Sequence, residues 1–266
     1  MDKSKHRQPS VTPAFRPGAS SSPPSVTPAF RPRIRPMKVI GLIGGMSWES
    51  SAVYYDIINR TVKEKLGGHH SCDCLMYSVD FAVIEKLQHE GDWDQLTLIM
   101  IDAAQRLERG GAELLVIATN TMHKMASEME KSIKIPLIHI VDTIADKIKA
   151  QGLTKVALLG TRFTMEQDFY KGRLTEKHAI EVIIPDLPGI ESVHRIIYEE
   201  LVHGIIKEES RQDYLRIIQE LIDRGAQGII LGCTEIPLLV KQADCAVPVF
   251  DTTKIHAVRA VEIALE

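Results

Sequence analysis

The sequence predicts an α/β fold with two pseudo-symmetric lobes, each a mostly parallel sheet flanked by helices, and an active site in the cleft between them. Short apolar runs rich in branched residues alternate with amphipathic stretches of helical period along residues 37–266. This alternation is typical of parallel sheets. The apolar runs also recur in the same order in both halves of the chain. Such a recurrence indicates an internal duplication.

The clearest repeat relates residues 111–121 to residues 225–235. GAELLVIATNT and GAQGIILGCTE align without a gap, and two shorter apolar blocks repeat at a similar offset of about 114 residues. Three blocks in one order at near-constant spacing indicate two related halves rather than chance similarity between strands. In this alignment Thr119 occupies the place of Cys233.

Residues 1–36 differ in composition from the rest of the chain. They are rich in proline, serine and arginine, and the octamer SVTPAFRP occurs twice in them. Prolines at this density prevent an amphipathic helix. We therefore expect a disordered or tag-derived segment, with Met37 as the natural start.

The first half of the fold begins with a predicted strand at residues 38–44 that leads into the turn Gly45-Met46-Ser47. Glycine lets a ligand approach the backbone there, and a serine can cap the helix that follows. The later elements are expected in this order: strand 75–79, helix 93–109, strand 114–118, helix 121–130 and strand 137–140.

The second half repeats the alternation and ends with a segment that should return to the first lobe. We expect the first lobe to comprise residues 37–135 plus 244–266, and the second to comprise residues 136–243. The elements expected here are helix 143–150, strand 156–159, helix 169–177, strand 180–184, helices 190–203 and 211–224, strand 247–250 and a final helix through Leu265.

Cys233 follows the apolar run 228–231, which predicts a buried parallel strand. Open α/β sheets bind ligands beyond the carboxyl ends of their strands, and a helix N-terminus there favours a thiolate. Cys233 is therefore a candidate reactive group, although a small buried residue is the simpler alternative. Polar residues at the two strand ends could cap helices or bind a carboxylate: Asn120, Thr121, Thr234 and Glu235.

Other candidate sites have weaker patterns. Residues 69–74 contain two histidines and two cysteines, but they lack the spacing of a zinc site, so we expect no metal. The turn after residue 44 lacks the Gly-x-Gly-x-x-Gly spacing of a dinucleotide site. His123 could be a satisfied helix residue, whereas His139 and Asp142 could orient Cys233 or contact an ammonium group.

Composition limits the class of protein. The 266 residues carry a formal net charge of −3, with 44% hydrophobic residues, which fits one or two globular domains and gives no sign of nucleic-acid binding. Four cysteines without a disulfide pattern indicate a reducing cytoplasm. No apolar run approaches the roughly 20 residues that cross a bilayer, so no membrane partner is expected.

Four motifs in this order resemble the aspartate/glutamate racemase family, and the resemblance covers residues 37–266. It implies two lobes around one cleft, a small-molecule amino-acid substrate, no cofactor, and a homodimer. It also implies that the residues before Asn-Thr and before Thr-Glu act as base and acid on opposite faces of the α-carbon. The motifs are Gly44-Gly45-Met46-Ser47, Asn120-Thr121-Met122-His123, Gly160-Thr161 and Gly232-Cys233-Thr234-Glu235.

Thr119 departs from the cysteine of most family members and resembles the subgroup specific for L-aspartate and L-glutamate. A thiol has a reference pKa near 8.5, whereas an aliphatic hydroxyl is far too weak an acid to act as a resting base. We expect Cys233, as a thiolate, to remove the α-proton of the L-amino acid. Thr119, or water that it positions, would reprotonate the other face, so the two directions should be unequal. The resemblance assigns the remaining ends of the substrate to Met46, Ser47 and Thr161.

The resemblance also implies a basic residue for the side-chain carboxylate ahead of residues 197–199, but residues 191–195 read ESVHR and offer no lysine. Three alternative functions stay open. The chain could be a decarboxylase or isomerase of the same superfamily, because one thiol suits one-sided protonation. It could be a catalytically idle amino-acid-binding protein. It could also be a cysteine hydrolase, although no histidine is assigned as its base.

Overall fold

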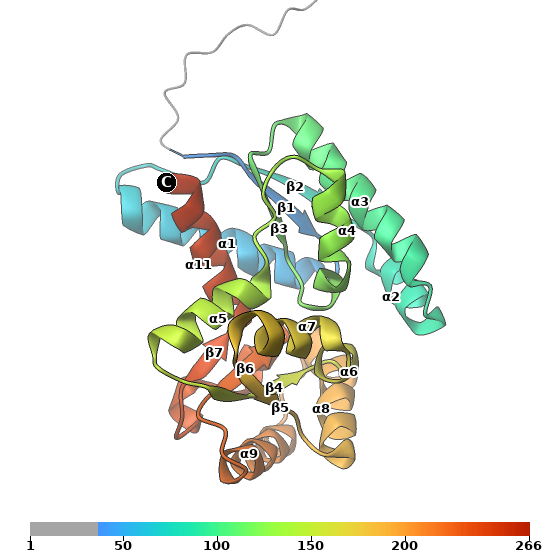
Figure 1. Cartoon of the computed structure of the whole chain (residues 1–266), viewed down its shortest axis with the longest axis vertical. Coiled ribbons are helices and arrows are strands. Elements are labelled where there is room, and N and C mark those ends of the chain that lie inside the picture. The colour runs from blue at the N-terminus through green and yellow to red at the C-terminus, as the bar shows by residue number, and fades with distance from the viewer. Residues whose placement is uncertain (1–36) are drawn as a thin grey trace, which may run out of the picture. The chain divides into compact units, whose positions relative to one another are not determined.

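Two parallel sheets organise residues 37–266, the part of the chain that the computed structural model describes (Figure 1). The segment 1–36, which we expected to be disordered, lies outside the described residues. The first sheet has the order β2-β1-β3, the second has the order β5-β4-β6-β7, and every pairing is parallel. The strands are β1 (Ile40–Gly44), β2 (Cys74–Ser78), β3 (Leu114–Ile117), β4 (Lys155–Gly160), β5 (Glu181–Ile183), β6 (Ile229–Gly232) and β7 (Val249–Asp251).

Helices flank both sheets, and hydroxyl or carboxylate side chains cap the first turn of several of them. Among residues 37–266, none of the helices has the length and apolarity to cross a bilayer. The helices are α1 (Trp48–Leu66), α2 (Phe81–Glu90), α3 (Trp93–Gly110), α4 (Ala126–Ser132), α5 (Ile140–Ala150), α6 (Arg162–Glu166), α7 (Asp168–Gly172), α8 (Leu187–Glu199), α9 (Glu208–Asp223), α10 (Ile236–Leu239) and α11 (Thr252–Leu265), with the short turns η1 (Thr121–Met125), η2 (Arg173–Lys177), η3 (Leu201–His203) and η4 (Gln242–Asp244).

The two sheets share one topology, which confirms the predicted pair of similar lobes. Strands β1, β2 and β3 are ordered as β4, β5 and β6 are. Leu137 makes a single parallel bridge with Leu115, at the position where β7 pairs with β6. The strand expected at residues 137–140 is reduced to this bridge because Ile140 already begins α5, whose first turn the His139 side chain caps.

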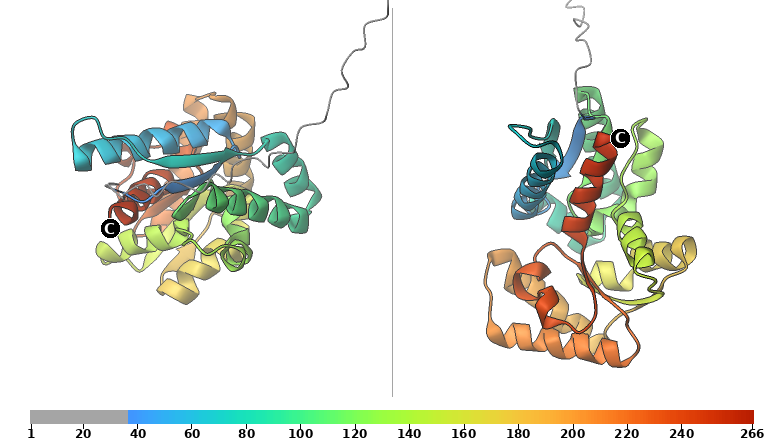
Figure 2. Two further views of the ribbon diagram at one scale, coloured as in Figure 1. Left: turned by 90° about the horizontal axis from the view of Figure 1, so that it is seen from above. Right: turned by 90° about the vertical axis from the view of Figure 1, so that its left-hand side faces the viewer.

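Each lobe gives its last helix to the other. Helix α5 follows the first sheet, yet Ile144 packs with Val156 of the second sheet. Helix α11 follows β7 and packs on α1 of the first lobe, as Figure 2 shows. Strand β7 itself pairs with β6, and this corrects our assignment of that strand to the first lobe. Phe250 of β7 is buried in the second core, so only α11 makes the expected return. The remaining lobe boundaries stay a prediction.

The turn after β1 requires glycine. Gly45 has φ of 93°, and a Cβ atom there would lie 2.1 Å from the carbonyl oxygen of Val79. The Gly45 N–H donates to Ser51 Oγ at 2.8 Å, which fixes the turn against α1. The chain therefore delivers Met46 and Ser47 to the carboxyl edge of the first sheet.

Candidate active site

One cavity at the carboxyl ends of the strands collects all nine residues that the sequence analysis assigned to the site. Both lobes line it, as expected for a site in the cleft between two sheets. The centres of water molecules can occupy about 50 Å³ of it, so it has room for several waters or a small ligand. The nine residues are Met46, Ser47, Thr119, Asn120, Thr121, Thr161, Cys233, Thr234 and Glu235.

Two buried strands place Thr119 and Cys233 at corresponding points of the two lobes. Strand β3 is wholly buried and ends two residues before Thr119, while the equally buried β6 ends immediately before Cys233. Gly232 lets β6 pair closely with β4, because a Cβ atom there would lie 2.9 Å from the Leu159 carbonyl oxygen. Thr119 and Cys233 are both partly buried and line the cavity.

Glu235 is the centre of a hydrogen-bond network at the Cys233 side of the cavity. Its Oε2 accepts hydrogen bonds from Cys233 Sγ at 2.9 Å and from Thr234 Oγ1 at 2.7 Å. Its Oε1 accepts from Ser50 Oγ at 3.0 Å and from Ser47 Oγ at 3.3 Å. Ser47 and Ser50 belong to the first lobe, so this carboxylate joins the two lobes at the catalytic cysteine candidate.

The same contact decides the protonation state of Cys233. Burial raises the pKa of the thiol well above its ordinary value, and the charge of Glu235 raises it further. Backbone N–H groups of Thr234 and Glu235 act in the opposite direction but are outweighed. Burial and the charge of Glu235 therefore favour the protonated thiol, so formation of a thiolate at Cys233 needs a proton acceptor. The short helix α10 that follows cannot offset a carboxylate 2.9 Å from the sulfur.

Asn120 and the neighbouring threonines form the Thr119 side of the cavity. Asn120 Nδ2 donates to Thr252 Oγ1 at 3.1 Å, and Thr252 in turn donates to the Leu231 carbonyl oxygen at 2.8 Å. Asn120 Oδ1 is buried without a hydrogen-bond partner among the described residues. Thr121 Oγ1 lies 3.5 Å from Thr161 Oγ1 of the other lobe. This side therefore offers one free acceptor and two hydroxyl groups.

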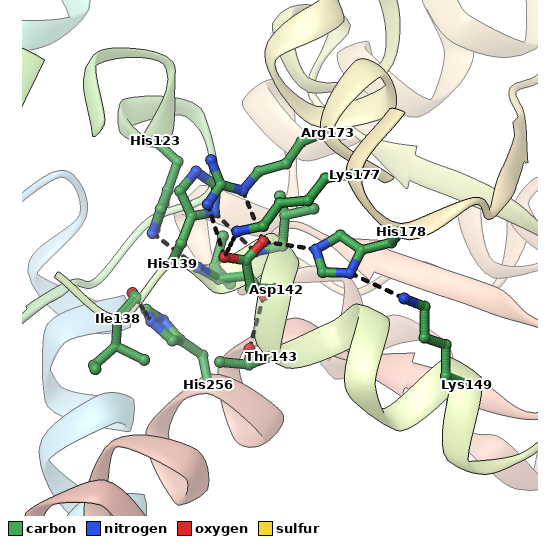
Figure 3. A network of polar contacts seen from close by, with 12 residues as sticks. His123, Ile138, His139, Asp142, Thr143, Lys149, Arg173, Lys177, His178 and His256 are labelled. Atoms are coloured by element: carbon green, nitrogen blue, oxygen red, sulfur yellow. Dashed lines mark hydrogen bonds and ion pairs between the residues drawn. The ribbon is translucent and has the colours of Figure 1, made fainter. Parts of the chain in front are cut away.

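His123 supports the backbone of Thr119 from behind the cavity (Figure 3). Its Nε2 accepts the N–H of Ile140 at 3.2 Å, so Nδ1 carries the proton and donates to the Thr119 carbonyl oxygen at 2.8 Å. Burial lowers the pKa of His123 well below its ordinary value, and His139 and His256 lower it further. His123 is thus a neutral, hydrogen-bonded helix residue, in agreement with the suggestion from the sequence that it could be a satisfied helix residue.

His139 and Asp142 lie outside the cavity lining, in the network that Figure 3 draws. His139 Nδ1 accepts the N–H of Val141 at 3.2 Å, and burial, followed by the charge of Arg173, lowers the pKa of His139 to about 3. Asp142 accepts two 2.7 Å hydrogen bonds from Arg173 and one each, at 2.8 Å, from Lys177 and His178. Burial alone would raise the pKa of Asp142, but these partners hold it well below its usual range. Both residues therefore anchor α5.

The structure adds lining residues that the sequence analysis missed, chiefly from α2 and α8. Gln88 and Phe81 lie on α2, whose only sequence signal was the capping residue Asp80 ahead of an apolar stretch. Tyr198 and Ile197 come from α8. Among the described residues, the lining of this cavity contains no lysine, arginine or histidine. The basic residue that the resemblance implied is therefore not in this lining.

Residues 37–266 contain no group of three His, Cys, Asp or Glu side chains that could hold a metal ion. Within the same range, the four cysteines are free thiols, and Cys233 lines the cavity while Cys72, Cys74 and Cys245 do not. The chemistry that the cavity itself offers is acid–base chemistry by a thiol, a carboxylate and several hydroxyl groups.

Comparison with known proteins agrees with this geometry. A solved structure of a provisionally named Asp/Glu racemase from Yersinia pestis is 57% identical, covers 86% of this chain and all of its own, and superposes with a TM-score of 0.83. An aspartate racemase homologue from Pyrococcus horikoshii is 39% identical over 86% of this chain and all of its own, with a TM-score of 0.77. The broad specificity amino-acid racemase RacX of Bacillus subtilis is 22% identical over 81% of this chain and 93% of its own.

A family-level match covers nearly the whole of the two lobes. The sequence model of the Asp/Glu/hydantoin racemase family matches residues 43–260, which include Thr119, Cys233 and every other residue that lines the cavity. The protein that carries this two-lobed fold and its single-thiol cavity therefore belongs to the Asp/Glu/hydantoin racemase family.

Proposed function

We propose that this protein is a cofactor-independent amino-acid racemase that acts on L-aspartate or L-glutamate. The observation that carries the proposal is the position of Cys233 and Thr119 at equivalent strand ends of two related lobes, lining one small cavity. Racemisation needs one acid–base group on each face of the α-carbon, and this arrangement supplies two. The names of the relatives from Yersinia pestis and Bacillus subtilis support the same class of reaction.

The first step takes place on the Cys233 side. The thiol first transfers its proton to Glu235, whose Oε2 already accepts the S–H hydrogen bond. The resulting thiolate removes the α-proton of the L-amino acid: the C–H bond breaks, an S–H bond forms, and the electron pair moves into the α-carboxylate as an enediolate. Substrate binding excludes water from the cavity, which strengthens these short-range interactions.

Polar groups around the cavity stabilise the charge that develops on the α-carboxylate. Thr121 and Thr161 present hydroxyl groups from opposite lobes, and backbone N–H groups lie at the start of η1. Donors fixed in advance stabilise an enediolate without reorganisation during the reaction. The free Oδ1 of Asn120 is an acceptor for the substrate ammonium group, which would satisfy an otherwise unpaired buried oxygen.

Reprotonation on the Thr119 side completes racemisation. Thr119 is too weak an acid to act as Cys233 does, so it donates through a water molecule that it positions, and the proton held by Cys233 and Glu235 returns to solvent. The equilibrium constant of racemisation is one, so kcat/KM for conversion is equal in the two directions. The asymmetry that we expect lies in proton exchange, because an L-amino acid can exchange with retention at Cys233.

The proposal is tested by proton NMR of L- and D-aspartate and L- and D-glutamate in D2O without added cofactor. We expect the α-proton signal of the L-forms to disappear and that of the D-forms to disappear more slowly. Cys233→Ser should abolish the exchange, whereas Cys245→Ser, a change at a thiol outside the cavity, should not. Binding of an amino acid by the wild type without any exchange would refute racemisation and support an idle binding protein.

A decarboxylase is the second candidate, favoured by the fact that Cys233 is the one thiol in the cavity lining of the described chain. Protonation of an enediolate from a single side needs only one such group. Turnover of a substituted malonate together with no exchange of aspartate or glutamate would support this alternative.

A further inference from the structure

The side wall of the cavity contains two polar side chains from opposite lobes. Gln88 lies on α2 of the first lobe and Tyr198 on α8 of the second, and both line the cavity. The rings of His89 and Tyr198 are 6.2 Å apart, edge to face, so α2 and α8 meet at this wall. Negative charge on Cys233 or Glu235 raises the pKa of Tyr198, so this wall lies close to the catalytic network.

Gln88 is largely buried, and its side chain makes no hydrogen bond to another of residues 37–266. Only 6% of its surface is exposed, but its polar atoms are not fully enclosed, and the residue lines the cavity. A carboxamide that loses its water to a ligand without gaining a hydrogen bond is destabilising, so a ligand that fills the cavity should hydrogen-bond to Gln88. The hydroxyl of Tyr198 also makes no hydrogen bond within the described chain, and burial raises its pKa above the ordinary value, which keeps it protonated. Both groups are donors that face a ligand space.

The charge of the cavity determines how a substrate side chain can be recognised there. Glu235 is the one carboxylate in the lining, and no cationic side chain from the described residues accompanies it. Four hydrogen bonds already engage this carboxylate. A polar side chain of the substrate must therefore be held by neutral groups, and Gln88 and Tyr198 are two neutral donors of this wall whose side chains make no hydrogen bond within residues 37–266.

We infer that Gln88, assisted by Tyr198, is the specificity-determining residue for the end of the substrate side chain, and that it accepts a carboxamide as well as a carboxylate. The inference rests on the proposed function, because it concerns the substrate of the same cavity. The Gln88 Nε2 group donates to a carboxylate, whereas the whole carboxamide donates to and accepts from a second carboxamide. A cation in this place would strongly favour the carboxylate, but a neutral group discriminates little between the two.

An amino acid with an apolar side chain should bind poorly in this cavity. It would remove water from Gln88 without replacing the lost hydrogen bonds, and such unpaired polar groups reject ligands strongly. The substrate class is therefore small amino acids with a planar polar side-chain end, of the aspartate, asparagine, glutamate and glutamine type.

The test is isothermal titration calorimetry of the full chain with L-aspartate, L-asparagine and L-alanine. For the wild type we expect the Kd values of L-aspartate and L-asparagine to lie within about tenfold of each other, and L-alanine to bind at least about tenfold more weakly. In Gln88→Leu, the Kd values of L-aspartate and L-asparagine should rise to that of L-alanine. Gln88→Glu should weaken L-aspartate by at least about tenfold but L-asparagine much less, because a glutamate repels a carboxylate and accepts from a carboxamide.

Controls separate recognition from a merely structural role. Gln95→Glu changes an exposed glutamine of α3 outside this cavity and should leave all three Kd values unchanged. The unequal loss of affinity for L-aspartate and L-asparagine in Gln88→Glu is a readout that general damage to the fold would not produce. Thermal denaturation of each variant checks that it is folded.

Several results would overturn the inference. These are binding of L-aspartate by Gln88→Leu within twofold of the wild type, equal losses for L-aspartate and L-asparagine in Gln88→Glu, or no binding of any ligand by the wild type. Proton exchange measured on the same samples keeps the two proposals apart. Selective binding without exchange would refute racemisation and still support the recognition role of Gln88.

Discussion

Replacing Glu235 with glutamine should lower the pKa of the Cys233 thiol and at the same time slow catalysis. In the structure Glu235 Oε2 accepts the Cys233 S–H hydrogen bond at 2.9 Å, and after burial the charge of Glu235 raises the pKa of that thiol further. A glutamine keeps the volume and one of the two accepting oxygens but removes the charge. The thiol would then ionise more readily, while the group that accepts its proton would be lost.

The size of the effect follows from Coulomb's law at the observed distance. Two unit charges 2.9 Å apart interact by about 1.4 kcal/mol with the dielectric constant of water and by about 6 kcal/mol with an effective value near 20. Removal of this repulsion favours the thiolate, so the pKa of Cys233 should fall in Glu235→Gln. Burial, the largest cause of the raised pKa, remains, so the thiol should not become a strong acid.

Alkylation by iodoacetamide as a function of pH measures this pKa, with peptide mass spectrometry to separate Cys233 from the other three cysteines. Glu235→Gln should shift the alkylation profile of Cys233 to lower pH and reduce α-proton exchange of L-aspartate. Glu199→Gln, at an exposed glutamate of α8, is the matched control and should change neither. An alkylation profile that stays in place or moves to higher pH would refute the electrostatic reasoning.

Three further predictions concern the opposite face of the site and the stability of the fold. Thr119→Cys should speed α-proton exchange of D-aspartate relative to L-aspartate in D2O, because a thiol is the stronger acid; an unchanged ratio would contradict it. Burial lowers the pKa of His139 to about 3 and of His256 to about 4, so as the pH falls these histidines are protonated in the unfolded chain before they are protonated in the folded protein. The free energy of unfolding should keep this contribution above about pH 6.5 and decrease below it by up to about 1.4 kcal/mol per pH unit for each histidine. Equal urea midpoints at pH 7 and pH 5 would contradict this prediction. Asp142→Asn should lower Tm more than Asp102→Asn, whose carboxylate makes only an exposed pair; equal calorimetric shifts would argue against the anchoring role.

The equivalence of Thr119 and Cys233 could be predicted from the sequence because a buried strand is recognisable locally. Residues 114–118 and 228–231 are continuous apolar runs followed by polar residues, and parallel strands of one sheet end at the same edge. The alignment of the two halves then needed no long-range information. The fold class and six of the nine cavity residues followed from this reasoning, whereas Met46, Ser47 and Thr161 were assigned through the family resemblance.

Elements whose positions depend on contacts with distant segments of the chain were predicted less well. Residues 137–140 read as a strand, but Ile140 is more stable as the first residue of α5, where it packs in the second core. Strand β7 was assigned to the first lobe, yet its hydrogen-bond partner β6 lies in the second. Helix α2 was not predicted because its apolar stripe is short, and its packing beside α3 provides the missing stabilisation.

The sequence by itself determined the α/β class, the duplication, the single thiol and its threonine counterpart, because these depend on local apolar patterns and on residue identity. Only the tertiary structure revealed what raises the pKa of the Cys233 thiol, since this shift depends on burial and on a carboxylate 2.9 Å away that also accepts hydrogen bonds from serines of the other lobe. The structure likewise brought Gln88 into the cavity and left its carboxamide without a hydrogen bond to any other of residues 37–266. Hydrogen bonding and desolvation act between residues far apart in the chain, and a local pattern cannot express them.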